Sequence, residues 1–97
     1  MESLPVNPKQ AAILIYSKDH CPYCDAAKNL FTQKGVGYTE IDLSQRPEEA
    51  PKMLEKSAGA KTVPQIFIGD AHIGGFDDTQ ALDTSGELEK LLFPNGR

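Results

Sequence analysis

The only two cysteines of the chain, Cys21 and Cys24, are three residues apart and enclose a Pro-Tyr pair. They follow the apolar run 12–16, which is typical of a buried strand, and precede the stretch 25–31, which has the pattern of a helix. A cysteine at a helix start lies beside unpaired backbone N–H groups and the positive end of the helix dipole, which favour its thiolate. Two sulfurs within one helical turn can also close and reopen a disulfide. The pair therefore predicts redox chemistry.

Length and charge limit the classes of protein to consider. The 97 residues suffice for a single domain, 1–97, with a modest core. The net charge of −4 and the scattered basic residues argue against a nucleic-acid or membrane surface. Residues 1–10 lack the apolar segment of a secretory signal, so we expect a cytoplasmic protein. In that compartment a Cys-x-x-Cys pair is more often catalytic or metal-binding than a structural bridge.

Periodicity and turn residues predict the elements that position the cysteines. Pro22 fits the first position of a helix, and Gly35 fits its end. Gly69-Asp70 predicts a tight hairpin turn. Asp77 or Asp78 is expected to cap a last helix, and this helix is expected to restart at Thr84, where Glu87 gives the spacing of a capping box. Strands are expected at 12–17, 38–43, 65–68 and 71–73, with a further helix that begins at Pro47.

The order of these elements predicts the sheet. A strand, a helix and a second strand of this length require a right-handed parallel crossover. A helix, a two-stranded hairpin and a final helix follow, so the full order of elements is β-α-β, then a helix, then β-β-α. We therefore expect an α/β protein with a four-stranded mixed sheet and helices on both faces.

Three motifs, in this order and spacing, resemble the glutaredoxin family: Cys-Pro-Tyr-Cys at 21–24, Thr-Val-Pro at 62–64 and Gly-Gly-Phe-Asp-Asp at 74–78. The resemblance covers a core of about 11–92. It implies a thioredoxin-like fold with strand order 2-1-3-4, flanked by three or more helices. It also implies an enzyme that reduces protein disulfides and protein–glutathione mixed disulfides. Glutathione is then the co-substrate, with no tightly bound cofactor and no metal.

In the implied reaction Cys21 is the nucleophile and Cys24 is the resolving thiol. A free cysteine with a pKa of ~8.5 is only about 3% thiolate at pH 7, and thiols at helix starts fall to roughly 3.5–7.5. The helix dipole supplies at most about 1.5 pK units of this change. A further donor or cation is needed, and Lys18 is the nearest candidate cation in the sequence. Asp25 faces the nucleophile one turn later, and we expect Asp25→Asn to lower the Cys21 pKa slightly.

The resemblance assigns glutathione binding to the other two motifs. In the family the proline of Thr-Val-Pro is cis, which turns the backbone toward the sulfur so that Val63 can pair with the cysteinyl part of glutathione. Backbone N–H groups at the start of the last helix suit the γ-glutamyl carboxylate. Asp78 suits the amino group, Asp77 is the expected cap, and Lys18 and Lys61 can meet the glycine carboxylate. The expected binding residues are Lys18, Tyr23, Thr62, Val63, Pro64, Gly75, Phe76, Asp77 and Asp78.

Each of these residues also has a plainer interpretation. Asp77 and Asp78 can be helix caps and nothing more. Tyr23 can be a surface tyrosine and Lys18 a solvated lysine. Without the resemblance, Pro64 would be expected to follow a trans peptide bond, because cis bonds are about 5–6% of those before proline.

Other functions compete for the cysteine pair. A zinc half-site or an inert bridge is possible, although the two histidines give no second pair at zinc spacing. A thioredoxin is disfavoured because the chain lacks tryptophan and a Gly-Pro pair between the cysteines. A third alternative is an iron–sulfur or glutathione-binding carrier module. Pro22 stiffens the loop between the cysteines and so disfavours a cluster shared between two chains. Ala60 stands where many family members have a polar side chain, which implies weaker glutathione binding. We expect a monomer whose partners are glutathione and disulfide-containing or glutathionylated proteins, with no nucleic acid and no membrane.

Overall fold

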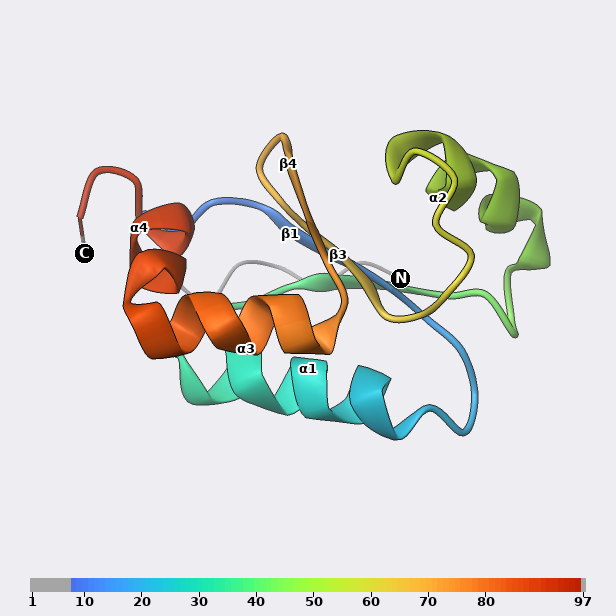
Figure 1. Ribbon diagram of the computed structural model, residues 1–97, viewed down its shortest axis with the longest axis horizontal. Coiled ribbons are helices and arrows are strands. Elements are labelled where there is room, and N and C mark those ends of the chain that lie inside the picture. Colours follow the sequence, from blue (N-terminus) through green and yellow to red (C-terminus); the bar gives the residue numbers. More distant parts are fainter. Residues whose placement is uncertain (1–7, 97) are drawn as a thin grey trace.

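The strands form one mixed sheet through the middle of the computed structural model, which describes residues 8–96 (Figure 1). The strands are β1 (Ile13–Ser17), β2 (Thr39–Asp42), β3 (Gln65–Ile68) and β4 (Ala71–Gly74). Their spatial order is β2-β1-β3-β4. β1 is parallel to β2 and antiparallel to β3, and β3 is antiparallel to β4. The expected strand order and the antiparallel third strand are confirmed.

Helices cover both faces of this sheet. α1 (Pro22–Gln33) and α3 (Phe76–Ser85) lie side by side beneath it, and α4 (Glu87–Leu92) continues from α3 (Figure 1). A short 3-10 turn, η1 (Pro47–Glu49), leads into α2 (Ala50–Lys56) on the other face. The predicted helix at Pro47 therefore begins with a 3-10 turn, and its α-helical part starts at Ala50. No helix within residues 8–96 is long and apolar enough to cross a membrane.

Alternation along the strands divides the core into two clusters. Ile13 and Ile15 point to the face covered by α1, α3 and α4, whereas Tyr16 points to the face covered by α2. The larger cluster adds Phe31 of α1 and residues of β3 and α4. The smaller cluster consists of Tyr16, Leu43, Met53 and Phe67. The central strand is thus fixed from both sides, and its carboxyl end, which leads to the cysteines, is fixed with it.

The end of α3 differs from the sequence prediction. The helix continues through Thr84 and ends at Ser85, where Gly86 takes the left-handed conformation at φ 88°. α4 then begins at Glu87, whose N–H donates to the Ser85 hydroxyl at 3.3 Å. The predicted restart at Thr84 is wrong, because a glycine that adopts a positive φ without steric cost ends a helix more strongly than a capping-box spacing restarts one.

Candidate active site

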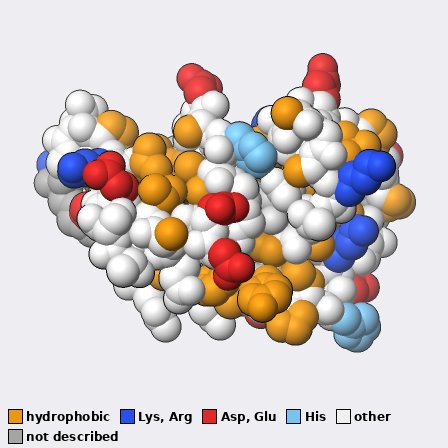
Figure 2. Space-filling model, in the orientation of Figure 1, with side chains coloured by type: hydrophobic (Ala, Val, Ile, Leu, Met, Phe, Trp, Pro, Cys, Tyr) orange, Lys and Arg blue, Asp and Glu red, His pale blue; other side chains and the backbone are white. Residues whose placement is uncertain are grey.

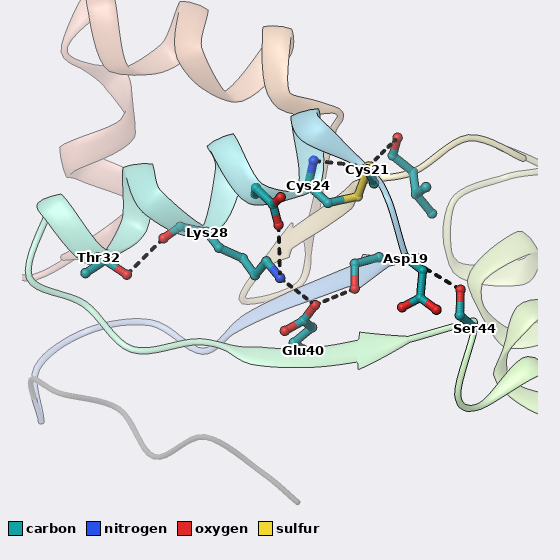
Figure 3. Close-up of polar contacts among 10 residues, drawn as sticks. Asp19, Cys21, Cys24, Lys28, Thr32, Glu40 and Ser44 are labelled. Carbon is teal, nitrogen blue, oxygen red and sulfur yellow. Dashed lines mark hydrogen bonds and ion pairs between the residues drawn. A yellow bond between two sulfur atoms is a disulfide. The ribbon is translucent and has the colours of Figure 1, made fainter.

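Cys21 and Cys24 form a disulfide across the first turn of α1, with 5.2 Å between their Cα atoms. Cys21 is the N-cap residue in extended conformation, and Pro22 occupies the first helical position. The Cys21 sulfur accepts the backbone N–H of Cys24 at 3.1 Å (Figure 3). Cys24 is only 1% exposed, whereas Cys21 is half-buried. One sulfur is therefore open to attack and held on a backbone donor that stabilises an anion there, while the other is covered.

The loop before β3 faces this sulfur. The Val63–Pro64 peptide bond is cis, which confirms the prediction. The Val63 carbonyl oxygen lies 3.9 Å from the Cys21 sulfur, although the two residues are 42 positions apart in the chain. The backbone of Val63 is consequently next to any molecule bonded to Cys21.

The start of α3 forms the other wall of the site. Gly75 is the N-cap residue, and its N–H donates to Asp78 Oδ2 at 3.1 Å. Asp78 is therefore the capping side chain, and the prediction of Asp77 as the cap is wrong: the third residue of a helix reaches back to the N-cap N–H, and that residue is Asp78. Gly74 has a φ of 114°, and a Cβ there would collide with the Asp78 carboxylate. This cap requires a glycine at position 74.

These segments enclose a groove of about 370 Å³. Tyr23 is 61% exposed and stacks on Phe76 with ring centroids 6.1 Å apart, so α1 and α3 meet at the groove. Figure 2 shows acidic side chains over the start of α3 beside hydrophobic ones over the start of α1. Every predicted binding residue except Lys18 lines the groove, namely Tyr23, Thr62, Val63, Pro64, Gly75, Phe76, Asp77 and Asp78. Ala60, Gln65, His72 and Gly74 complete the lining.

Lys18 lies at a different groove. This second groove, of about 360 Å³, is lined by Lys18 and Lys61 together with residues around α2, namely Leu43, Pro47, Ala50, Met53 and Leu54. Both lysines are exposed. Their role toward the glycine carboxylate stays a prediction.

A charged network lies along α1 behind the cysteines (Figure 3). The Lys28 ammonium is 3.0 Å from Glu40 Oε2 and 3.6 Å from Asp25 Oδ1. Burial lowers the pKa of Lys28, but the hydrogen bond and the charge of Glu40, followed by the charge of Asp25, raise it above its usual value. Glu40 also accepts the Ser17 hydroxyl. The Asp25 charge, which we expected to oppose the thiolate, is thus partly neutralised by Lys28, and the predicted effect of Asp25→Asn becomes smaller.

Sequence reasoning missed two polar residues of the groove, Gln65 and His72. Gln65 is the first residue of β3, and its side chain is hydrogen-bonded both to Thr62 and to His72. The available signal was a glutamine at the start of an otherwise apolar buried strand. A buried amide requires partners, and those partners were not visible in the sequence.

An accessible sulfur at a helix N-cap, a covered second sulfur and a cis-proline loop facing them define a thiol–disulfide oxidoreductase of the thioredoxin-like fold. The glutaredoxin family model matches residues 13–73, and the chain belongs to the glutaredoxin family. It is 46% identical to glutaredoxin 3 of Escherichia coli over 82 residues, which cover 84% of this chain and 98% of that protein. It is 48% identical to glutaredoxin 1 of Rickettsia conorii over 81 residues, which cover 82% of this chain and 79% of that protein.

Solved structures show the same fold. A crystal structure of a buckwheat glutaredoxin–glutathione complex matches with a TM-score of 0.76 and 34% identity, over 84% of this chain and 76% of that one. The solution structure of a glutaredoxin from Brucella melitensis matches with a TM-score of 0.75 and 42% identity, over 94% of this chain and 99% of that one.

Proposed function

We propose that this glutaredoxin uses glutathione to reduce protein–glutathione mixed disulfides and protein disulfides. The observation that supports the proposal best is the placement of the Val63 backbone 3.9 Å from the Cys21 sulfur, within a groove that also contains the start of α3. A cysteinyl residue bonded to Cys21 has a strand-like backbone partner there. Its γ-glutamyl end has the backbone N–H groups and the two aspartates of α3 within the same groove. The buckwheat relative was solved with glutathione.

The reaction with a glutathionylated protein uses Cys21 alone. Its thiolate attacks the glutathione sulfur of the mixed disulfide, and the protein leaves as a thiolate that takes up a proton. The thiolate of a second glutathione then attacks the glutathione sulfur of the Cys21–glutathione disulfide. Oxidised glutathione leaves, and the Cys21 thiolate is regenerated. Low basicity of Cys21 helps this last step, because a less basic thiolate is a better leaving group.

Reduction of a protein disulfide uses both cysteines. Cys21 attacks one sulfur of the substrate and forms a mixed disulfide with the protein. Cys24, one helical turn away, attacks the Cys21 sulfur and releases the reduced protein. This leaves the Cys21–Cys24 disulfide, the form that the structure describes. Two glutathione molecules, each giving one electron and one proton, return the pair to the dithiol and become oxidised glutathione.

The two routes predict different behaviour of two cysteine variants. Cys21→Ser lacks the nucleophile, so its rate should fall to background on every substrate. Cys24→Ser keeps the first route, so it should reduce a glutathione mixed disulfide at a rate within about threefold of the wild type. It should fail on substrates that need the dithiol route. The measurement is reduction of a glutathionylated peptide, coupled to glutathione reductase.

Outcomes against the proposal are specific. An active Cys21→Ser variant would show that Cys21 is not the nucleophile. A wild-type enzyme that ignores glutathione but accepts electrons from a flavin-dependent thioredoxin reductase would support the thioredoxin alternative. A cytoplasmic location and a monomeric state belong to this proposal as well, and fractionation of cells and light scattering of the reduced protein test them.

A further inference from the structure

Gln65 is a buried amide with hydrogen bonds at both ends. Gln65 is only 4% exposed, and its backbone pairs with Tyr16 of the central strand β1. Gln65 Nε2 donates to the Thr62 carbonyl oxygen at 3.0 Å and to the Thr62 hydroxyl oxygen at 3.2 Å. Gln65 Oε1 lies 2.7 Å from His72 Nε2. The nitrogen and the oxygen of the amide therefore both have partners.

His72 is itself held in place by Phe67. The two residues pair across β3 and β4, and their rings stack with centroids 4.9 Å apart. Gln65 and Phe67 are two residues apart on one strand, so they share a face of the sheet with His72. Because Gln65 Oε1 can only accept, Nε2 of the imidazole donates in this contact. The Thr62 carbonyl oxygen can only accept, so it requires the amide nitrogen at its end, and the imidazole N–H holds the amide oxygen at the other.

This arrangement ties the cis-proline loop to the sheet. Thr62 is exposed and directly precedes Val63, whose carbonyl faces the Cys21 sulfur. The two bonds from Gln65 span the loop from its first residue to the first residue of β3. The Thr62 hydroxyl oxygen accepts one of these bonds, so its own proton is available to an acceptor in the groove that Thr62 lines.

We propose that Gln65, oriented by His72, is a positioning residue that holds residues 62–64 in the conformation that receives the glutathionyl part of the substrate. The inference rests on the proposed function. Neither side chain is hydrogen-bonded to a sulfur, and the backbone donor to the Cys21 sulfur is the Cys24 N–H of α1. Loss of the hydrogen bonds between Gln65 and Thr62 should therefore weaken binding of the substrate and leave the rate of the chemical step almost unchanged.

Four variants test the inference. Gln65→Leu removes the amide, and His72→Phe keeps a ring over Phe67 but removes the N–H donor. The double variant combines these two changes. Gln33→Leu, at the exposed end of α1, is the matched control for the loss of a glutamine amide. For each protein, KM and kcat are measured with a glutathionylated peptide, and reaction of reduced Cys21 with iodoacetamide reports on the nucleophile.

We expect Gln65→Leu to raise KM about five- to tenfold, with kcat and the alkylation rate within about twofold of the wild type. His72→Phe should raise KM about two- to threefold. The double variant should match Gln65→Leu alone, because His72 acts only through that amide. Gln33→Leu should match the wild type. If Gln65→Leu does not fold, the KM of His72→Phe alone decides whether the inference holds. That variant is expected to fold, since it removes only one donor near the surface.

An unchanged KM in Gln65→Leu or His72→Phe, a loss confined to kcat, or additive effects in the double variant would overturn the inference. The wild type separates this failure from a failure of the proposed function. If the wild type does not turn over the glutathionylated peptide, the proposed function is wrong. If the wild type is active and the Gln65 and His72 variants match it, only the positioning role is wrong.

Discussion

The position of the Cys21 sulfur is set by the place of the residue in the chain. Cys21 is the last residue of the loop between β1 and α1, and it is the N-cap of α1. The N-cap position directs its sulfur to the Cys24 N–H, and Pro22 starts α1 without leaving an unsatisfied donor. Tyr16 of β1, the strand that precedes the cysteines, lies in a different environment. Tyr16 is fully buried, and its hydroxyl is the one buried side-chain polar atom within residues 8–96 that has no hydrogen-bond partner.

Replacement of this tyrosine tests the energetic effect of the unpaired hydroxyl. We expect Tyr16→Phe to raise the free energy of unfolding by about 1 kcal/mol at pH 7, because a buried polar group without a partner costs about 1–3 kcal/mol. Urea unfolding followed by circular dichroism measures the change. Tyr23→Phe is the control, since its ring is 61% exposed and its stability should stay within about 0.5 kcal/mol. A Tyr16→Phe variant less stable than the wild type would contradict the expectation.

The same residue predicts a dependence on pH. Burial, and then the charge of Glu49, raise the pKa of Tyr16 above its usual value of 10.0. The folded state thus holds the phenolic proton more tightly than the unfolded state. The stability linked to this group is complete below pH 10 and is lost as the pH rises through the folded-state pKa. Between pH 9 and 11 the free energy of unfolding, measured by urea unfolding at each pH, should therefore fall less steeply for Tyr16→Phe than for the wild type.

At the scale of elements, the start of α3 combines a structural and a proposed binding role. Asp78 accepts the Gly75 N–H, and the absence of a side chain at Gly74 makes room for its carboxylate. The same carboxylate lines the groove. The cap needs an acceptor oxygen, whereas recognition of the glutathione amino group needs a negative charge. The two roles can therefore be separated by changing one property at a time.

Asp78→Asn keeps an acceptor oxygen and removes the charge. We expect its free energy of unfolding to stay within about 0.5 kcal/mol of the wild type and its KM for glutathione to rise several-fold. Asp78→Ala should add a loss of about 0.5–2 kcal/mol of stability. Glu55→Gln, at an exposed position of α2 outside the groove, is the matched control for the change in net charge. If Asp78→Asn binds glutathione as the wild type does, Asp78 is a helix cap only.

At the scale of the whole molecule, the sheet separates two hydrophobic cores, one with more buried residues than the other. The larger core joins β1 and β3 to α1 and α4, and the smaller one joins the sheet to α2. Phe31 is fully buried in the larger core, ten residues after Cys21 on the same helix. Packing of this ring fixes α1 against the sheet, and so fixes the cysteines at its other end.

Truncation of Phe31 tests this dependence. We expect Phe31→Ala to lower the free energy of unfolding by about 3–5 kcal/mol, because it removes buried apolar area and leaves a cavity. That is a large part of the roughly 5–15 kcal/mol that stabilises a domain. The neighbouring Thr32→Ala, at an exposed position, should change it by less than about 0.5 kcal/mol. Equal urea midpoints for the two variants would show that α1 is held by other contacts.

The sequence alone determined the features that depend on neighbouring residues. Short apolar runs, one alternating segment, Pro22, Gly35 and the Gly69-Asp70 turn predicted the strands, the first helix and the hairpin within a residue or two. The placement of Cys21 at the start of α1 followed from the same local signals. The cis bond before Pro64 came only with the family resemblance, since local preference favours trans.

Only the tertiary structure decided which distant side chains meet. It assigned the cap of α3 to Asp78, placed Lys18 at a groove beside α2, joined Gln65 to His72 and left the Tyr16 hydroxyl unpaired. Helix and strand patterns reflect interactions over a few residues. A hydrogen bond or a groove depends on the exact register and packing of strands and helices far apart in the chain. A shift of one residue in a strand would send side chains such as Tyr16 and Gln65 to the opposite face of the sheet.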